Sequence, residues 1–202
     1  MKNTRIIFTL LLALLTVGGV KAQSVDTAEV VLKNIMTRSS IRTFQQRPVE
    51  KEKIEKLLRA GMAAPTSMDR RPWHFVVLSE KEDIERYAAS NEHHADKIRK
   101  TPLFIIVCGD TTKMQEGAGR DFWIQDNSCA SENILLAAHA MGLGAVWTSA
   151  YPIQKKVDGI RKALHLSERF IPLNVICIGY PAEPADIKDK WNPDDITYGI
   201  KE

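Results

Sequence analysis

The sequence has few cysteines, and none of them are spaced as pairs. Its 202 residues include three cysteines, Cys108, Cys129 and Cys177, without a CxxC spacing. An odd number leaves at least one thiol free even in an oxidising compartment, and the apolar runs around Cys108 and Cys177 are explained by burial. We therefore expect no disulfide framework.

The chain also lacks a strong excess of charge of one sign. The formal net charge is +3, part of it comes from basic residues near the N-terminus, and no block of basic residues follows. Proteins that bind nucleic acids neutralise phosphates with clustered lysine and arginine. We therefore expect no nucleic-acid partner.

Long apolar runs are absent after the first twenty residues, because every later run is shorter and flanked by charges. Lys2 and Arg5 precede an apolar run over residues 6–20, and a small-x-small sequence ends at Ala22. This layout is typical of a cleaved secretory signal. A retained anchor is the alternative, but the run is short and contains glycine, whereas a membrane span needs about 20 apolar residues. The sequence predicts a signal peptide over residues 1–22, cleaved after Ala22, and a periplasmic or secreted protein without membrane contact after cleavage.

The remaining residues, 23–202, contain no internal repeat, low-complexity segment or linker, which predicts one domain. The run at 103–109 is continuously apolar, as expected of a strand covered on both faces. Interleaved strands and helices predict an α+β domain with a sheet covered on both faces. Apolar spacing predicts helices over 24–36, 48–62, 80–90, 120–141 and 153–166, and strands over 73–78, 103–109, 145–150 and 171–180.

Four polar clusters stand at the ends of these elements. They are RSSIR at 38–42, APTSMDRRPW at 64–73, WTSA at 147–150 and IKDK at 187–190. Arginines and hydroxyls at a helix end, with lysines in an exposed tail, are the donor types that hold a phosphate. Each cluster taken singly is also explained as solvated surface, so the interpretation depends on all four together.

The four clusters, in this order, resemble the motifs of the nitroreductase family of flavin enzymes. The resemblance is carried by RSSIRTF, APTSMDRRPWHF, the segment DNSCASENILLAAHAMGLGAVW at 126–147, and IGYPAEPADIKDKW at 178–191. It implies that residues 23–202 form a nitroreductase-like FMN-binding domain. The implied α+β fold has a central mixed sheet flanked by helices, and the implied assembly is an intertwined homodimer with one FMN at each of two sites in the subunit interface.

The resemblance also implies which residues bind the cofactor. Arg38, Ser39, Ser40 and Arg42 match the first motif, where the first arginine and the second serine hold the phosphate and ribityl end of FMN. The last basic residue, Arg42, approaches the N1/C2=O edge of the ring. That edge gains negative charge on reduction, so a nearby cation should stabilise the reduced flavin.

Three further segments supply the other implied cofactor-binding residues. One is an arm that reaches the FMN held by the partner subunit, the second is a strand end whose backbone N–H groups reach flavin N5, and the third is a tail that closes on the phosphate. In this sequence they are Pro65, Thr66, Ser67 and Asp69 in the arm, Thr148, Ser149 and Ala150 at the strand end, and Lys188 and Lys190 in the tail.

Two positions depart from the family pattern. Asp69 stands where relatives usually carry asparagine, and Arg71 stands where they usually carry glutamine. A carboxylate can accept a hydrogen bond but cannot donate one, so Asp69 serves only part of the role of an amide. Arg71 either pairs with Asp69 and neutralises it, or adds positive charge at the mouth of the substrate site.

Other polar residues either have a structural explanation or have a role that the sequence does not decide. His93 and His94 are adjacent, but no third ligand lies at zinc-like spacing, so we expect an exposed helix end and no metal. Lys97 precedes a strand at a place where the family has a basic residue, and its contact with the flavin stays open. We assign no catalytic side chain, because water or a backbone group can complete the protonation that accompanies hydride transfer.

The sequence therefore predicts an FMN-dependent NAD(P)H oxidoreductase with a ping-pong mechanism. Its partners are a second copy of the chain, a small-molecule electron donor, and a nitroaromatic, quinone or other electron-poor acceptor. Three alternatives stay open: a flavin carrier or scavenger without turnover, a structural dimer without flavin, and a reductase of another type that acts on enones or removes halogens. Export would separate the enzyme from cytoplasmic NAD(P)H, and the signal has no twin-arginine pair, so the donor outside the cytoplasm also stays open.

Overall fold

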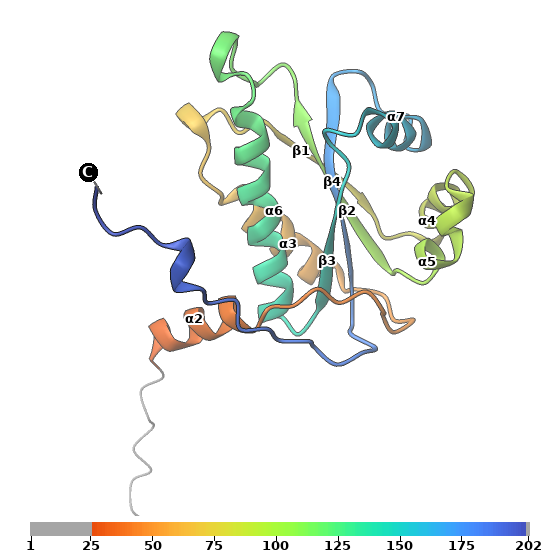
Figure 1. Ribbon diagram of the computed structural model, residues 1–202. Helices are drawn as coiled ribbons and strands as arrows, with labels where there is room; N and C mark the ends of the chain where they lie inside the picture. The colour runs from red at the N-terminus through yellow and green to blue at the C-terminus, as the bar shows by residue number, and fades with distance from the viewer. Residues whose placement is uncertain (1–25, 201–202) are drawn as a thin grey trace, which may run out of the picture. The chain divides into compact units, whose positions relative to one another are not determined.

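The computed structural model describes residues 26–200 (Figure 1). The predicted signal peptide and its cleavage site lie outside the described residues. A compact unit begins at Leu32 and carries the sheet. Helix α2, Thr27–Thr37, leads into this unit. None of the helices within residues 26–200 is long and apolar enough to cross a membrane.

Four strands form one sheet in the order β1-β2-β4-β3. The strands are β1 (Trp73–Leu78), β2 (Leu103–Asp110), β3 (Gly144–Ser149) and β4 (Phe170–Gly179). Each of the four strands predicted from the sequence is present, with ends that agree to within one residue. The long apolar runs β2 and β4 occupy the centre of the sheet, and the α+β class is confirmed.

The expectation of a mixed sheet needs correction. The three neighbouring pairs of described strands are all antiparallel. Among residues 26–200, parallel pairing is limited to an isolated bridge between Ser40 and Ala145. Phe44 forms a second isolated bridge, antiparallel, to Pro181. Because the segment between these two bridges pairs only at its ends, it does not extend into a fifth strand.

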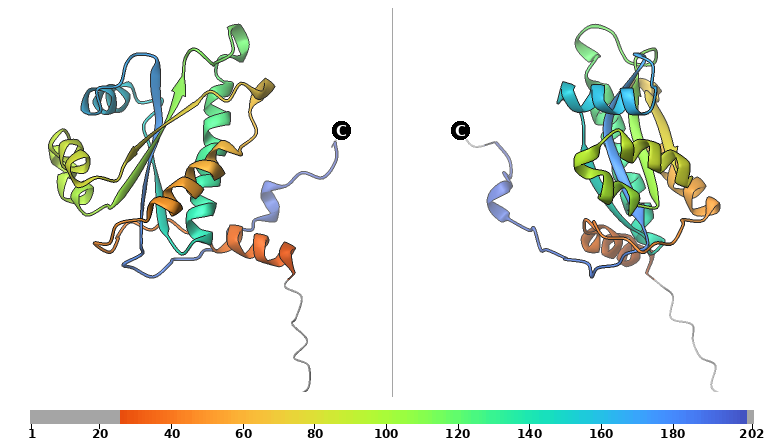
Figure 2. Two further views of the ribbon diagram at one scale, coloured as in Figure 1. Left: turned by 180° about the vertical axis from the view of Figure 1, so that it is seen from behind. Right: turned by 90° about the vertical axis from the view of Figure 1, so that its right-hand side faces the viewer.

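Helices cover both faces of the sheet, as the continuous apolar run in β2 predicted (Figure 2). One face packs against α3 (Lys51–Met62) and α6 (Phe122–Ala140). The other packs against α4 (Lys81–Ala89), α5 (Ala95–Arg99) and α7 (Gln154–Ala163). Successive side chains of a strand point to opposite faces. Leu103, Ile105 and Val107 therefore enter the α3/α6 core, and Phe104, Ile106 and Cys108 enter the other.

Short 3-10 helices lie in the connections. They are η1 (Ser67–Asp69), η2 (Glu92–His94), η3 (Gly117–Gly119) and η4 (Pro193–Asp195). Gly142, with φ of 72°, follows the end of α6, where glycine commonly terminates a helix. Helix α3 begins at Lys51 rather than at Pro48, since Glu50 still has an extended backbone and Val49 is buried in the core.

Candidate active site

The first motif follows the end of α2 and lies beside the C-terminal half of α6. The Arg38 side chain is mostly buried, and its Nε lies 3.5 Å from Glu132 Oε1. Just before it, Thr37 Oγ1 is 2.9 Å from His139 Nε2. The Ser39 hydroxyl oxygen is buried and has no hydrogen-bond partner among the described residues. A buried hydroxyl without a partner is unusual in a native structure, so this one is available to a ligand or to water.

A pocket of about 220 Å³ opens next to this motif. Its lining includes Arg38, Ser39, His139, Ala145 and Glu183, which come from the first motif, α6, β3 and the chain after β4. Burial lowers the pKa of His139, and the nearby Arg38 lowers it further, which favours the neutral imidazole. A guanidinium beside an unpartnered hydroxyl matches the donor chemistry that phosphate requires. Arg38 and Ser39 therefore supply donors that fit the phosphate end of FMN, and the Glu183 carboxylate in the same lining is occupied by hydrogen bonds from Arg42 and Thr43.

The first motif is tied to the root of the C-terminal tail. Glu183 Oε1 accepts hydrogen bonds from the backbone N–H of Arg42 at 2.6 Å and of Thr43 at 3.1 Å. The Thr43 hydroxyl donates to the other oxygen of Glu183 at 3.0 Å. The hydrogen bond from the Arg42 backbone N–H, followed by those from the Thr43 hydroxyl and backbone N–H, lowers the pKa of the Glu183 carboxyl. The Arg42 side chain donates to the Ser40 carbonyl at 3.3 Å and is exposed, which leaves its charge accessible to a ligand.

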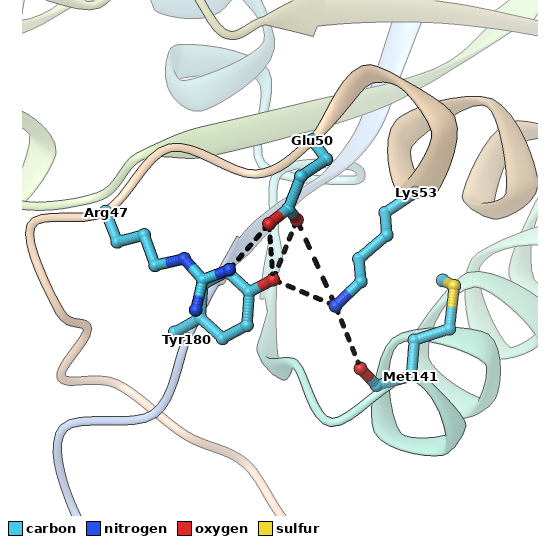
Figure 3. A network of polar contacts seen from close by, with 5 residues as sticks. All are labelled: Arg47, Glu50, Lys53, Met141 and Tyr180. Carbon is cyan, nitrogen blue, oxygen red and sulfur yellow. Dashed lines mark hydrogen bonds and ion pairs between the residues drawn. The ribbon is translucent and has the colours of Figure 1, made fainter.

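A second polar cluster anchors the end of β4 (Figure 3). The Tyr180 hydroxyl donates to the Glu50 carboxylate at 2.7 Å, and Lys53 Nζ donates to the same hydroxyl at 2.9 Å and to the Met141 carbonyl at 3.3 Å. Arg47 lies over the Tyr180 ring, 3.9 Å from its centroid, and donates to Glu50 at 2.7 Å. These bonds, chiefly the one from Tyr180, lower the pKa of Glu50 to about 2. The cluster fixes where the tail leaves the sheet.

The arm lies between α3 and β1 and has an unusual backbone. Met68, Asp69 and Arg71 have φ of 54°, 53° and 50°, in the left-handed region that non-glycine residues seldom adopt. Arg71 Nε and Nη2 donate to the two oxygens of Asp69 at 2.8 and 2.6 Å. Of the two roles considered for Arg71, the structure shows pairing with Asp69. Both side chains are exposed, so the pair stays accessible to solvent.

Two residues outside the arm form hydrogen bonds with it. Neither was assigned a role from the sequence. Asp126, near the start of α6, accepts the Ser67 backbone N–H at 2.9 Å. Gln115, in the connection between β2 and α6, donates to Ser67 Oγ at 2.6 Å. Asp126 could have been noticed as an acid within a buried helical face, whereas nothing in the sequence around Gln115 marks it.

Some polar groups at the end of β3 already form hydrogen bonds within the chain. The Ala150 N–H donates to the Leu173 carbonyl at 2.9 Å, and Ala150 is buried. Trp147 Nε1 donates to Ser149 Oγ at 2.9 Å, and Thr148 and Ser149 are exposed. Within this strand end, Thr148 and Ser149 are therefore the residues open to a ligand.

The tail lysines are not brought against the first motif. Lys188 and Lys190 are exposed, and Lys188 Nζ pairs with Asp186 at 3.2 Å. Lys97 is exposed on α5. His94 is exposed at the end of η2, and no group of three His, Cys, Asp or Glu side chains within the described part of the chain could hold a metal ion.

The arm and the first motif lie at opposite ends of α6. The arm contacts Asp126, in the first turns, while Thr37 contacts His139, in the last turn. At 1.5 Å of rise per residue, Asp126 lies about 20 Å along the helix from His139 and about 9 Å from Glu132, which pairs with Arg38. Within residues 26–200, no hydrogen bond or ion pair joins the arm to the first motif.

Comparisons with known proteins agree with this architecture. The family model described as "Nitroreductase family" matches residues 35–94 and 85–180. A protein of Methanothermobacter thermautotrophicus, provisionally named NADH dehydrogenase/NAD(P)H nitroreductase, is 46% identical over 166 residues, or 82% of this chain and 85% of that protein.

Two solved structures share the fold over most of their length. A crystal structure from Parabacteroides distasonis with the same provisional name is 44% identical with a TM-score of 0.76, and the match covers 85% of this chain and 99% of that chain. A provisionally named nitroreductase from Desulfovibrio desulfuricans, crystallised in complex with FMN, is 27% identical with a TM-score of 0.72, over 85% and 98% of the two chains. With a family match over more than half of its length, this chain belongs to the nitroreductase family.

Proposed function

We propose that this protein is an FMN-dependent NAD(P)H oxidoreductase, active as a homodimer in which each flavin site is built from two chains. The lack of any hydrogen bond or ion pair between the arm and the first motif among the described residues carries the proposal, because a second copy can bring its arm to the first motif of its partner. The FMN bound in the relative from Desulfovibrio desulfuricans supports the choice of cofactor.

An exposed apolar face supports the second copy. Leu32, Ile35 and Met36 of α2 are exposed in the single chain, although their spacing is that of a buried helical stripe. Apolar side chains clustered on one helix face are typical of a protein interface. We propose that this stripe packs against the second copy.

The residues of the first motif, the end of β3 and the tail each contact a different part of FMN in this proposal. Bound FMN supplies the hydride chemistry. Arg38 and Ser39 border the pocket that suits its phosphate, with Ser40 next to them. The exposed guanidinium of Arg42 stabilises negative charge on the N1 side of the ring. Thr148 and Ser149 face the flavin from the open end of β3, and the tail lysines close over the phosphate once the dimer has formed.

We propose alternating half-reactions, in which the donor reduces the flavin and leaves before an electron-poor acceptor takes the electrons. Nitroaromatics and quinones are the acceptors of choice. Enone reduction and dehalogenation are alternative reactions that use the same cofactor. A flavin carrier without turnover is the non-enzymatic alternative.

Anaerobic mixing of the purified, FMN-loaded protein with NADH and with NADPH tests the activity. Bleaching of the flavin absorbance by one of them, and its return on adding a nitroaromatic or a quinone, is the expected result. Flavin that is bound but not reduced by either donor would favour the carrier. Protein that takes up no added FMN would favour a structural dimer.

Export is a separate proposal, based on the N-terminal sequence alone. N-terminal sequencing of the protein recovered from a host with a periplasm should find Gln23 as the first residue. A chain that still begins at its first residue would contradict the predicted cleavage after Ala22.

A further inference from the structure

The arm holds a strained backbone that must be stabilised by its surroundings. Three of its residues, Met68, Asp69 and Arg71, have positive φ without being glycine. Each such residue costs on the order of 1–3 kcal/mol and persists only where neighbouring contacts over-determine the conformation. Within the arm, Thr66 Oγ1 accepts the Arg71 N–H at 3.2 Å and the Asp69–Arg71 pair closes the turn.

The contacts from outside the arm converge on Ser67. Asp126 accepts its backbone N–H, and Gln115 donates to its hydroxyl oxygen. Gln115 itself lies against Gly119, where a Cβ atom would come within 2.5 Å of Gln115 Oε1. A side chain at Gly119 would therefore push the Gln115 amide away from its present place.

Asp126 is a buried carboxylate, and its burial is energetically unfavourable. Its exposed fraction is 7%, and no lysine or arginine in the described part of the chain forms an ion pair with it. Burial raises the pKa of its carboxyl, while the bond from Ser67 opposes this change. A buried carboxylate without a cation costs free energy, so its retention beside a strained loop indicates a role in holding that loop.

The two outside contacts leave Ser67 with a single free donor. Its N–H is occupied by Asp126, and one lone pair of its hydroxyl oxygen is occupied by Gln115. A serine hydroxyl has one O–H donor and two acceptor lone pairs. The O–H proton is therefore free, and the hydrogen bond received from Gln115 polarises it and makes it a better donor.

We propose that Asp126 and Gln115 are positioning residues that aim the Ser67 hydroxyl as a hydrogen-bond donor to an acceptor atom of FMN held by the partner chain. This inference rests on the proposed flavin site. It adds two residues that do not themselves touch the cofactor, and it assigns the direction of the hydrogen bond.

Flavin titration of the dimer, followed by protein fluorescence, tests the two positions. Asp126→Ala should raise the Kd for FMN about tenfold, the ratio that corresponds to one hydrogen bond. Asp126→Asn should restore most of the affinity, because the amide oxygen still accepts the Ser67 N–H. The matched control is Asp121→Ala, at an exposed aspartate just before α6, which should leave the Kd unchanged.

The direction of the bond is tested at Gln115. Gln115→Glu places a carboxylate that accepts the Ser67 O–H instead of donating to it, so it should weaken FMN binding as much as Ser67→Ala does. Combining Ser67→Ala with Gln115→Glu should add no further loss, because both changes remove the same donor. Gly119→Ala should weaken binding in the same sense by displacing Gln115.

The outcomes separate this inference from the proposed function. Wild-type protein that binds no FMN overturns the flavin site itself. Wild-type protein that binds FMN, together with Asp126→Ala and Gln115→Glu proteins of equal affinity, overturns only the positioning role. Loss of affinity in Asp126→Ala that asparagine does not rescue would also count against the inference, since the accepted N–H bond would then not be the cause.

Discussion

At the scale of the residue, Asp110 shows how one carboxylate closes the end of the central strand β2. Its exposed fraction is 1%. It accepts hydrogen bonds from Arg169 at 2.7 and 2.6 Å and from the hydroxyl and N–H of Thr112 at 2.7 and 3.1 Å. These partners, Arg169 first, hold the pKa of Asp110 well below its usual value.

Asp110→Asn should lower the free energy of unfolding at pH 7 by about 2 kcal/mol, because bonds to a charged group are weakened. Since the native pKa is depressed, the contribution of Asp110 is fully present above its unfolded pKa, about 4, and is lost as pH falls below it. Urea unfolding of both proteins from pH 7 to pH 3 should show the difference shrinking. Asp96→Asn, at an exposed site on α5, should stay within about 0.5 kcal/mol of wild type.

Tyr180→Phe tests the cluster at the root of the tail. The change removes the hydroxyl that chiefly lowers the pKa of Glu50 to about 2, so that pKa should rise towards 4.5. Because the native pKa is lowered, the stability that Glu50 contributes is present above pH 4.5 and is lost as pH falls towards 2. An NMR titration of the Glu50 side chain measures the pKa directly. A value that stays near 2 in the variant would assign the effect to the hydrogen bond from the Glu50 backbone and to Arg47.

At the scale of the element, the contact between β2 and the start of α6 depends on a missing side chain. A Cβ on Gly109 would overlap Trp123 of α6 and come within 2.5 Å of Met114. Both of those side chains are buried with Leu173 in one cluster. The absence of a side chain at Gly109 allows the indole to pack directly on the strand.

Gly109→Ala should therefore destabilise the protein by about 1–3 kcal/mol, the usual cost of overpacking a core. Gly159 is the matched control, because a Cβ on this exposed residue of α7 would meet nothing within 4 Å among the described residues beyond its own helix. Gly159→Ala should stabilise the helix by about 0.5–1 kcal/mol. Thermal unfolding distinguishes the two, and equal shifts in both would show that packing at Gly109 is not limiting.

The helices and strands also show which bounds the apolar periodicity of the sequence predicts and which it does not. The strands follow their apolar runs closely, because each run must be buried to be stable. The short α5 was not predicted, since five residues are too few to show a helical period. The start of α3 was placed too early at Pro48, because the contacts that keep Glu50 extended come from Tyr180, 130 residues away.

At the scale of the whole molecule, the proposed homodimer makes the most direct prediction. Replacing Leu32 and Ile35 with glutamate puts charge on the apolar face of α2, which costs several kcal/mol in a buried interface. The double variant should sediment as a monomer and lose FMN affinity. Lys33→Glu, on the same helix, should remain dimeric. Analytical ultracentrifugation gives the answer, and a wild-type protein that is monomeric at micromolar concentration would contradict the proposed assembly.

The sequence by itself determined the α+β class, the four strands and the nitroreductase family, because these depend on apolar periodicity and on motifs read along the chain. It also named both Asp69 and Arg71, but only the tertiary structure decided that they pair. The places of Asp126 and Gln115 beside Ser67, and the separation of the arm from the first motif, were likewise decided only there. The physical reason is that hydrogen bonds between residues about 50 positions apart depend on how helices and strands pack, which no local pattern encodes.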